Sequence, residues 1–219
     1  MKIVVDENMP HACELFAEFG EVVPLPGRQI GAADLQDADV LLVRSVTRVD
    51  AGLLADCPRL GFVGTATIGT DHIDTALLAE RGIPFFSAPG CNKYSVGDYV
   101  LSALLVLAER HELSLDQMSL AVIGAGNTGE CVAGKAEALG MRVLRCDPPR
   151  ARQEGAAGFV DYQTALSADI VSFHVPLTRS GDDVTFHLLD AEQIAARPAG
   201  QFLINVSRGE VWDNPALLA

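Results

Sequence analysis

The residues with the clearest chemical potential form a glycine-rich turn within "LAVIGAGNTGECVAGKAEALG". An apolar run delivers Gly124, Gly126 and Gly129, the GxGxxG spacing, directly into a helical pattern. The first glycine permits a tight turn, the second lets a pyrophosphate approach the backbone, and the third lets the helix pack closely on the strand. Free N–H groups at the helix N-terminus then bind the diphosphate, which the helix dipole also favours. The spacing therefore predicts a dinucleotide site.

A carboxylate at the end of the next apolar run indicates which dinucleotide this site favours. "RVLRC" is followed by Asp147, eighteen residues after Gly129. An aspartate at this point accepts hydrogen bonds from the adenosine ribose hydroxyls and repels a 2′-phosphate, which favours NAD over NADP. Arg150 and Arg152 leave NADP open, because a guanidinium accommodates a phosphate. The alternative is a plain glycine-rich strand–helix turn in which Asp147 only caps the helix.

Two further polar residues follow apolar runs. Arg208 comes just after the run at 202–205 in "FLINVSRGE", and His174 follows the run at 169–173 in "SFHVPLT". Open α/β sheets bind ligands outside the carboxyl ends of their strands, so both residues are candidates for a site. For His174 we favour a scaffold role, since a histidine at a strand end is more often a satisfied structural residue.

The elements that must position these residues alternate between short apolar runs and helical patterns. Continuous apolar strands separated by helices are typical of a parallel sheet buried on both faces. The expected strands lie at 2–5, 21–24, 39–43, 61–65, 83–86, 120–124, 142–146, 169–173 and 202–205. The expected helices include 11–19, 51–54, 75–81 and a long one at 96–110.

A Pro/Gly/Asn-rich segment, "SAPGCNKYS" at 87–95, separates two series of strands. We therefore expect an α/β fold with two doubly wound parallel-sheet domains, a substrate-binding domain at 1–93 and a dinucleotide-binding domain at 94–219. A complete dinucleotide-binding sheet has about six strands. Only four are expected after residue 95, so the second domain is expected to be incomplete.

Composition argues against several classes of function. The chain has 219 residues with a formal charge of −13, which disfavours nucleic acid and anionic membranes as partners. Five scattered cysteines without CxxC spacing argue against a disulfide framework or a zinc site, and we expect no metal. The longest apolar run, at 100–108, is too short to cross a bilayer, and no signal-peptide pattern is present. We expect a cytoplasmic protein.

The segments "VIGAGNTG", "CDPPR", "SFHVPLT" and "INVSRGEVWDN", in this order, resemble the D-2-hydroxyacid dehydrogenase family. The resemblance implies a flavodoxin-like substrate domain and a Rossmann NAD-binding domain that enclose a cleft. Val175 stands where a threonine is usual, so its contact with the cofactor must come from the backbone or methyl groups. The NAD contacts that the resemblance implies are Gly124, Gly126, Asn127, Gly129, Asp147, Val175, Val206, Ser207 and Arg208.

Within the family, "DENMP", "VRSVTRV", "GTATIGTDHID" and "APGCN" resemble the branch that oxidises the C2 hydroxyl of 4-phospho-D-erythronate to the 2-oxo acid in pyridoxal 5′-phosphate biosynthesis. The resemblance implies that Arg208 is catalytic, binding the substrate carboxylate through its planar fork and polarising the C2 oxygen. It also implies substrate contacts at Ser45 and Thr67, for which ordinary turn capping is the alternative. Arg44 is a further candidate for the substrate phosphate.

The family's remaining catalytic residues, a glutamate and a proton-accepting histidine, follow the SRGxxxDN motif in sequence that this chain does not contain. None of its five histidines matches that position. We therefore expect the N-terminal part of a longer enzyme, inactive by itself and a homodimer when full length. Two alternatives stay open: a phosphoglycerate dehydrogenase-like enzyme, and a non-catalytic NAD-binding remnant.

Overall fold

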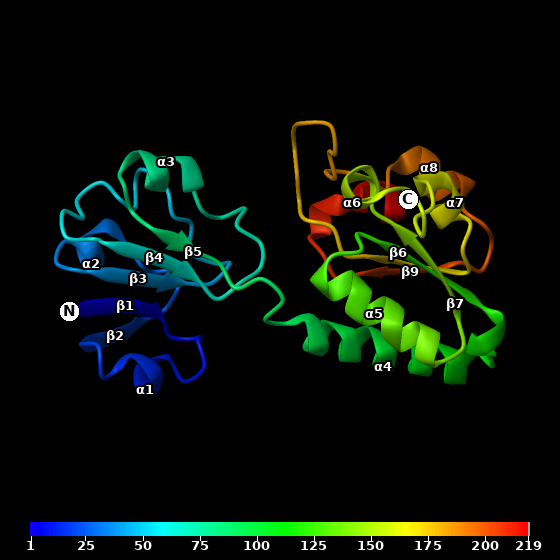
Figure 1. Cartoon of the computed structure of the whole chain (residues 1–219), viewed down its shortest axis with the longest axis horizontal. Coiled ribbons are helices and arrows are strands. Elements are labelled where there is room, and N and C mark those ends of the chain that lie inside the picture. Colours follow the sequence, from blue (N-terminus) through cyan, green and yellow to red (C-terminus); the bar gives the residue numbers. More distant parts are fainter. Residues whose placement is uncertain (219) are drawn as a thin grey trace. The chain divides into compact units, whose positions relative to one another are not determined.

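The computed structural model describes residues 1–218, and the chain divides into two compact units, Met1–Cys91 and Asn92–Ala219. Each unit is a parallel β-sheet with helices on its faces (Figure 1). This confirms the α/β fold with two parallel sheets.

The first unit is built on a five-stranded parallel sheet in the order β2-β1-β3-β4-β5. This is the flavodoxin-like order, in which the connections run to both sides of the first strand. The strands are β1 (Lys2–Asp6), β2 (Glu21–Leu25), β3 (Val40–Val43), β4 (Phe62–Thr65) and β5 (Phe85–Phe86).

Alternate residues of each strand point to opposite sides of this sheet, and each side packs into its own core cluster. Val4 of β1 packs in a core cluster with Leu35 of one helix and Leu78 of another, whereas Ile3 and Val5 pack with Ala12. The helices are α1 (Ala12–Phe16), α2 (Ala32–Leu35) and α3 (Thr75–Glu80).

The expected helix at 51–54 is wrong, since residues 51–56 form hydrogen-bonded turns. Asp50 Oδ1 accepts hydrogen bonds from the N–H groups of Gly52 and Leu53, at 3.0 and 3.1 Å. Asp50 therefore caps this segment as it would cap a helix, and the N–H of Leu54 donates to the carbonyl of Asp50 at 3.0 Å, but the segment continues as turns only.

The second unit is built on a four-stranded parallel sheet in the order β7-β6-β8-β9. Beside the edge strand β7, the N–H of Val160 donates to the carbonyl of Arg145 at 2.8 Å, so at least one carbonyl of that edge is satisfied. At the other edge, every residue of β9 is partly buried. The strands are β6 (Ser119–Ile123), β7 (Arg142–Cys146), β8 (Ile170–Phe173) and β9 (Phe202–Asn205).

Helices cover both faces of the second sheet. Figure 1 shows α4 and α5 on one face and α6, α7 and α8 on the other. Val122 of β6 packs with Val132 of α5 on the first face, whereas Ile123 packs with Ala165 of α7 on the second. The helices are α4 (Lys93–His111), α5 (Asn127–Ala138), α6 (Pro148–Glu154), α7 (Tyr162–Leu166), α8 (Ala191–Ala196) and α9 (Asn214–Leu218), with short 3-10 turns at Leu115–Gln117 and Gly209–Val211.

The close packing of α4 on α5 explains a glycine inside α4, near its N-terminus. A Cβ atom at Gly97 would lie 2.7 Å from Cys131 Sγ and 2.9 Å from Lys135 Cε, both on α5. The ion pair between Lys135 and Asp98, at 2.8 Å, joins the two helices beside this contact. A glycine inside a helix costs about 1 kcal/mol in helix propensity. Here it allows two helices to approach more closely than alanine would.

Two absences can be stated for the described part of the chain. No helix within residues 1–218 combines the length and the apolar character of a membrane span. Over the same residues, no group of three or more His, Cys, Asp or Glu side chains is placed to hold a metal ion.

Candidate functional site

The glycine turn begins at the carboxyl end of β6. Gly124 has a φ of 90°, in the region that favours glycine, and its N–H donates to the carbonyl of Cys146 at 2.8 Å. A Cβ atom here would lie 2.9 Å from the backbone carbon of His174 and 2.9 Å from Val175 Cγ1. The turn therefore lies directly against the segment that follows β8.

The other two glycines of the motif have opposite surroundings. A Cβ atom at Gly129 would lie 2.0 Å from the carbonyl oxygen of Gly124, so this position allows the helix to pack on the turn. A Cβ atom at Gly126 would meet no heavy atom within 4 Å. Gly126 is the N-cap residue of α5 and makes no side-chain cap, so the first N–H groups of this helix face an open side.

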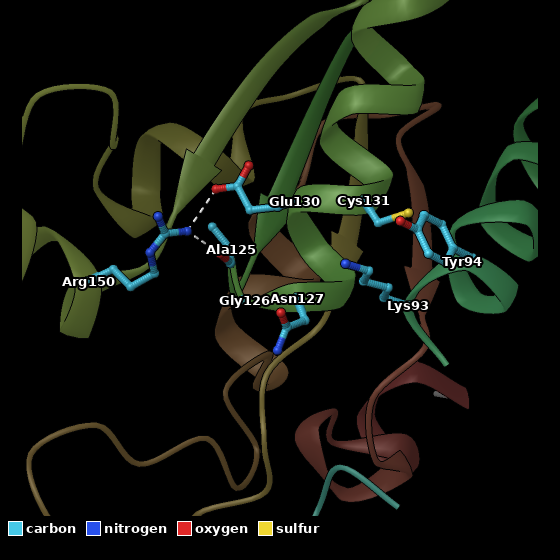
Figure 2. Close-up of a pocket in the computed structure, with 8 residues that line it drawn as sticks. All are labelled: Lys93, Tyr94, Ala125, Gly126, Asn127, Glu130, Cys131 and Arg150. Atoms are coloured by element: carbon cyan, nitrogen blue, oxygen red, sulfur yellow. Dashed lines mark hydrogen bonds and ion pairs between the residues drawn. The ribbon is translucent and has the colours of Figure 1, made fainter. Parts of the chain in front are cut away.

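That open side is a pocket of about 620 Å³ around the first turn of α5. Figure 2 shows Lys93 and Arg150 on either side of this turn, with Gly126 and Asn127 between them. The Lys93 ammonium also lies 5.0 Å from the ring centre of Tyr94. The lining residues are Lys93, Tyr94, Ala125, Gly126, Asn127, Glu130, Cys131 and Arg150.

Four of these lining residues were not predicted from the sequence: Lys93, Tyr94, Glu130 and Cys131. Lys93 lies in the segment chosen as the boundary between two domains, and no local spacing relates it to the glycine motif. A cation at the start of a long helix is the only signal that was available. Its approach to the pocket depends on how α4 packs against α5.

Asp147 connects the glycine turn to the next helix. Its Oδ2 accepts a hydrogen bond from the N–H of Ala125 at 2.9 Å, and its Oδ1 accepts one from the N–H of Arg150 at 3.0 Å. Asp147 is thus the N-cap of α6, with Pro148 in the first turn. The helix cap that the sequence offered as the alternative role of Asp147 is therefore present. Each carboxylate oxygen keeps acceptor capacity, so ribose binding stays a prediction.

The two arginines near Asp147 both have acidic partners. Arg150 forms a two-pronged pair with Glu154, from Nε to Oε1 and from Nη2 to Oε2, each at 2.8 Å. Its Nη1 also donates to Glu130 Oε1 at 2.7 Å and to the carbonyl of Ala125. The hydrogen bonds that Arg150 donates to Glu154 and Glu130 raise the pKa of Arg150 above its ordinary value. Arg152 pairs with Asp183.

His174 is held in the scaffold of the turn. Its N–H donates to the carbonyl of Ile123 at 2.7 Å, and its Nε2 shares a hydrogen bond of 2.9 Å with Ser172 Oγ. Part of the residue reaches solvent, but Nδ1 is buried, and desolvation lowers the pKa of the imidazole from 6.5 to about 4. The ring is therefore neutral at neutral pH, consistent with the scaffold role predicted from the sequence.

The segment that carries Arg208 is shaped by Asn205 at the end of β9. The N–H and Oγ of Ser207 both donate to Asn205 Oδ1, at 2.9 and 2.6 Å, and Asn205 Nδ2 donates to the carbonyl of Arg208 at 3.0 Å. The N–H of Val206 donates to the carbonyl of Phe173 at 3.3 Å. Residues 206–208 therefore lie at the same sheet edge as Val175 and the glycine turn. Asn205, which organises them, was not predicted.

In the first unit, the predicted substrate residues lie at the carboxyl edge of the sheet. Ser45 and Thr67 follow β3 and β4, which are neighbouring strands, and Ser45 is exposed. Thr67 Oγ1 is hydrogen-bonded to Thr65 Oγ1 at 2.7 Å and donates to the carbonyl of Gly69 at 2.9 Å, so it also braces its own turn. The exposed Arg44 donates from Nη1 to the carbonyl of Asn8, just past β1, at 3.0 Å.

Comparison with known proteins adds relatives that match the whole chain. It is 86% identical over 222 residues to the erythronate-4-phosphate dehydrogenase of Aeromonas hydrophila subsp. hydrophila, covering 100% of this chain and 59% of that protein. It is 62% identical over 218 residues to the erythronate-4-phosphate dehydrogenase of Tolumonas auensis, covering 100% of this chain and 58% of that protein. The chain thus spans less than two thirds of the length of these relatives.

A solved structure agrees with the fold. D-lactate dehydrogenase from Aquifex aeolicus, complexed with NAD and lactic acid, is 25% identical, with a TM-score of 0.82 over 98% of this chain and 72% of that one. Residues 105–219 match the family model described as D-isomer specific 2-hydroxyacid dehydrogenase, NAD binding domain. The chain therefore belongs to the D-isomer specific 2-hydroxyacid dehydrogenase family, and its second unit carries the NAD-binding domain of that family.

Proposed function

We propose that this chain is part of an NAD-dependent dehydrogenase that oxidises the C2 hydroxyl of 4-phospho-D-erythronate to the 2-oxo acid, a step of pyridoxal 5′-phosphate biosynthesis. The observation that carries the proposal is the 86% identity, over the whole chain, to an erythronate-4-phosphate dehydrogenase. The identity extends through the first unit, which carries the proposed substrate residues Ser45 and Thr67, so it bears on the substrate as well as on the cofactor.

The cofactor contacts of the proposal follow from the geometry of the second unit. The pyrophosphate would lie over Gly126 and Asn127, where the N-terminus of α5 opens into the pocket. The adenosine ribose would bind Asp147, which already borders the turn. The segment at 206–208 and the backbone of Val175 would contact the nicotinamide half, and NAD, when bound, accepts the hydride.

The substrate contacts of the proposal come from the first unit and from Arg208. Arg208 would bind the C1 carboxylate as a planar fork and polarise the C2 oxygen. Ser45, Thr67 and Arg44 would hold the phosphate or the hydroxyls, with residues 1–93 as the substrate-binding domain and 94–219 as the NAD-binding domain. A chain with a formal charge of −13 requires local donors for such an anion, and Arg44 supplies a cation at this edge.

The proposal requires a proton acceptor for the C2 hydroxyl. His174 does not suit this role, because its Nε2 is bonded to Ser172 and its pKa is about 4. A base works best with a pKa near the operating pH. We therefore assign proton transfer to the histidine and glutamate that the family carries after the SRGxxxDN motif. A cytoplasmic homodimer is part of the same proposal, and sedimentation of the full-length protein tests its oligomeric state.

The test is NAD reduction by the full-length protein with 4-phospho-D-erythronate and, in parallel, with 3-phospho-D-glycerate. We expect a higher kcat/KM for 4-phospho-D-erythronate, and a preference for 3-phospho-D-glycerate would support the phosphoglycerate dehydrogenase alternative. Arg208→Ala should reduce turnover by at least about a hundredfold while NAD still binds, because it removes charge stabilisation at the reacting oxygen. Absence of turnover with either substrate, with NAD bound normally, would support the non-catalytic alternative.

A further inference from the structure

Arg150 lies in a position where it could decide between NAD and NADP. The peptide of Ala125 connects it to Asp147: the N–H of Ala125 donates to Asp147 Oδ2, and the carbonyl of Ala125 accepts from Arg150 Nη1. The guanidinium and the carboxylate thus lie against the same residue of the glycine turn. In many NADP-binding sites an arginine near this point accommodates the 2′-phosphate.

The donors of Arg150 are, however, almost fully used. A guanidinium has five N–H donors. Nε–H and one Nη2–H donate to Glu154, and Nη1 donates to Glu130 and to the Ala125 carbonyl. One Nη2–H is left. A 2′-phosphate would have to displace a two-pronged carboxylate before it gained a comparable contact.

The charges around this arginine point the same way. Glu130 also accepts from Arg145 Nε at 3.1 Å, and Arg145 Nη1 donates to Glu137 at 2.8 Å. Together with Asp147, this cluster therefore contains two guanidinium groups and four carboxylates. The guanidinium groups are those of Arg145 and Arg150, and the carboxylates are those of Glu130, Glu137, Glu154 and Asp147. Burial opposes ionisation of Glu130, but its hydrogen bonds to Arg150 and Arg145 lower its pKa overall, so this carboxylate is charged at neutral pH. The local charge is negative, which repels a dianionic phosphate.

We propose that Glu154 and Glu130 are specificity-determining residues of the NAD site, because they hold Arg150 away from a 2′-phosphate and so reinforce the exclusion of NADP by Asp147. The exclusion then has two components. Asp147 repels the phosphate directly, and the two glutamates deny it the cation that would otherwise compensate. Loss of Asp147 alone leaves the second component in place.

The test measures binding of NAD and NADP to the chain by isothermal titration calorimetry, so its outcome is independent of any substrate. The parent variant is Asp147→Ser, since serine retains a cap acceptor for α6. Asp147→Ser/Glu154→Gln releases Arg150. Asp147→Ser/Glu137→Gln is the matched control, because it removes one negative charge from the same network without touching Arg150.

We expect Asp147→Ser to weaken NAD binding and to bind NADP poorly. Relative to it, Asp147→Ser/Glu154→Gln should bind NADP at least about tenfold more tightly, and the control less than about threefold more tightly. The gain should shrink at high salt, as expected for a charge contact. Equal gains in the two double variants, or full NADP binding by Asp147→Ser alone, would overturn the proposal.

Should Asp147→Ser fail to fold by circular dichroism, the comparison is made in the native background. Glu154→Gln should then raise the ratio of NADP to NAD affinity more than Glu137→Gln does. Equal ratios of NADP to NAD affinity in these two single variants would also contradict the proposal. A chain that binds neither dinucleotide would contradict the site itself, whereas failure of the substrate assay would leave this binding result standing.

Discussion

Gly129 packs directly on the carbonyl oxygen of Gly124, since a Cβ atom at Gly129 would lie 2.0 Å from that oxygen. The atom that an added Cβ would meet belongs to the backbone, so no change of side-chain rotamer can relieve the contact. Gly126, between them, has an open side instead. One motif therefore contains a glycine required for packing and a glycine required for access, and substitution can separate the two.

Gly129→Ala should destabilise the second unit. The added methyl forces α5 away from the glycine turn, and overpacking of this kind costs about 1–3 kcal/mol. Thermal unfolding followed by circular dichroism should show a lower Tm for the variant. An unchanged Tm would mean that the turn and α5 adjust freely.

Gly126→Ala should leave stability nearly unchanged and impair NAD binding. Its φ of −76° suits alanine, and no atom lies within 4 Å of the added Cβ. The methyl would occupy the space through which the pyrophosphate approaches the backbone, so we expect at least about a tenfold weaker Kd by calorimetry. Binding at the native Kd would show that the pyrophosphate does not approach this glycine.

Gly97→Ala should destabilise the chain although alanine is the better helix former. The gain of about 1 kcal/mol in propensity is opposed by the contact with Cys131 Sγ, 2.7 Å from the added Cβ. In the Cys131→Ala background, Gly97→Ala should cost less, and chemical denaturation of the four proteins in this cycle measures the difference.

Gly134→Ala is the matched control for that cycle. Gly134 also lies within a helix, α5, but it is exposed and nothing lies within 4 Å of its added Cβ. It should stabilise the chain by about 1 kcal/mol. If Gly97→Ala stabilised equally, close packing of α4 on α5 would not explain the glycine.

His174 should make stability depend on pH in a defined window. Its pKa is about 4 in the folded chain against 6.5 ordinarily, so the unfolded chain binds more protons between these values. The contribution is fully present above pH 6.5 and is lost as the pH falls toward 4, amounting to at most roughly 3 kcal/mol. The free energy of unfolding of His174→Gln should fall less steeply over this window. Parallel curves for the two proteins would mean that His174 titrates normally.

Lys93→Gln should weaken NAD binding and reduce its dependence on salt, because Lys93 borders the pocket where the pyrophosphate would lie. We expect a Kd roughly three to ten times higher, as for one partly solvated charge contact. Lys135→Gln is the control: this lysine pairs with Asp98 and does not line the pocket. The same loss in both variants would indicate a general charge effect.

The sequence by itself determined the strands and the glycine turn, because both are written in neighbouring residues. Continuous apolar runs produced β3, β6 and β8 where expected, since strands buried on both faces need no polar alternation. The helix predicted at 51–54 was wrong: Asp50 provides the cap, but the segment is too short to hold more than turns, and isolated short helices gain little from local sequence. Ligand contacts at Ser45, Thr67 and Asp147 remain predictions.

Only the tertiary structure decided the surroundings of the charged groups. Arg150 lies on α6 and Glu130 on α5, twenty residues earlier, and their pairing exists because the two helices follow neighbouring parallel strands, β7 and β6, and begin at the same edge of the sheet. Lys93 reaches the pocket through the packing of α4, and His174 is neutral because burial of most of its ring disfavours the charged form. A sequence pattern fixes local dihedral angles and burial, whereas the partner and the protonation state of a charge depend on which distant segments fold against it.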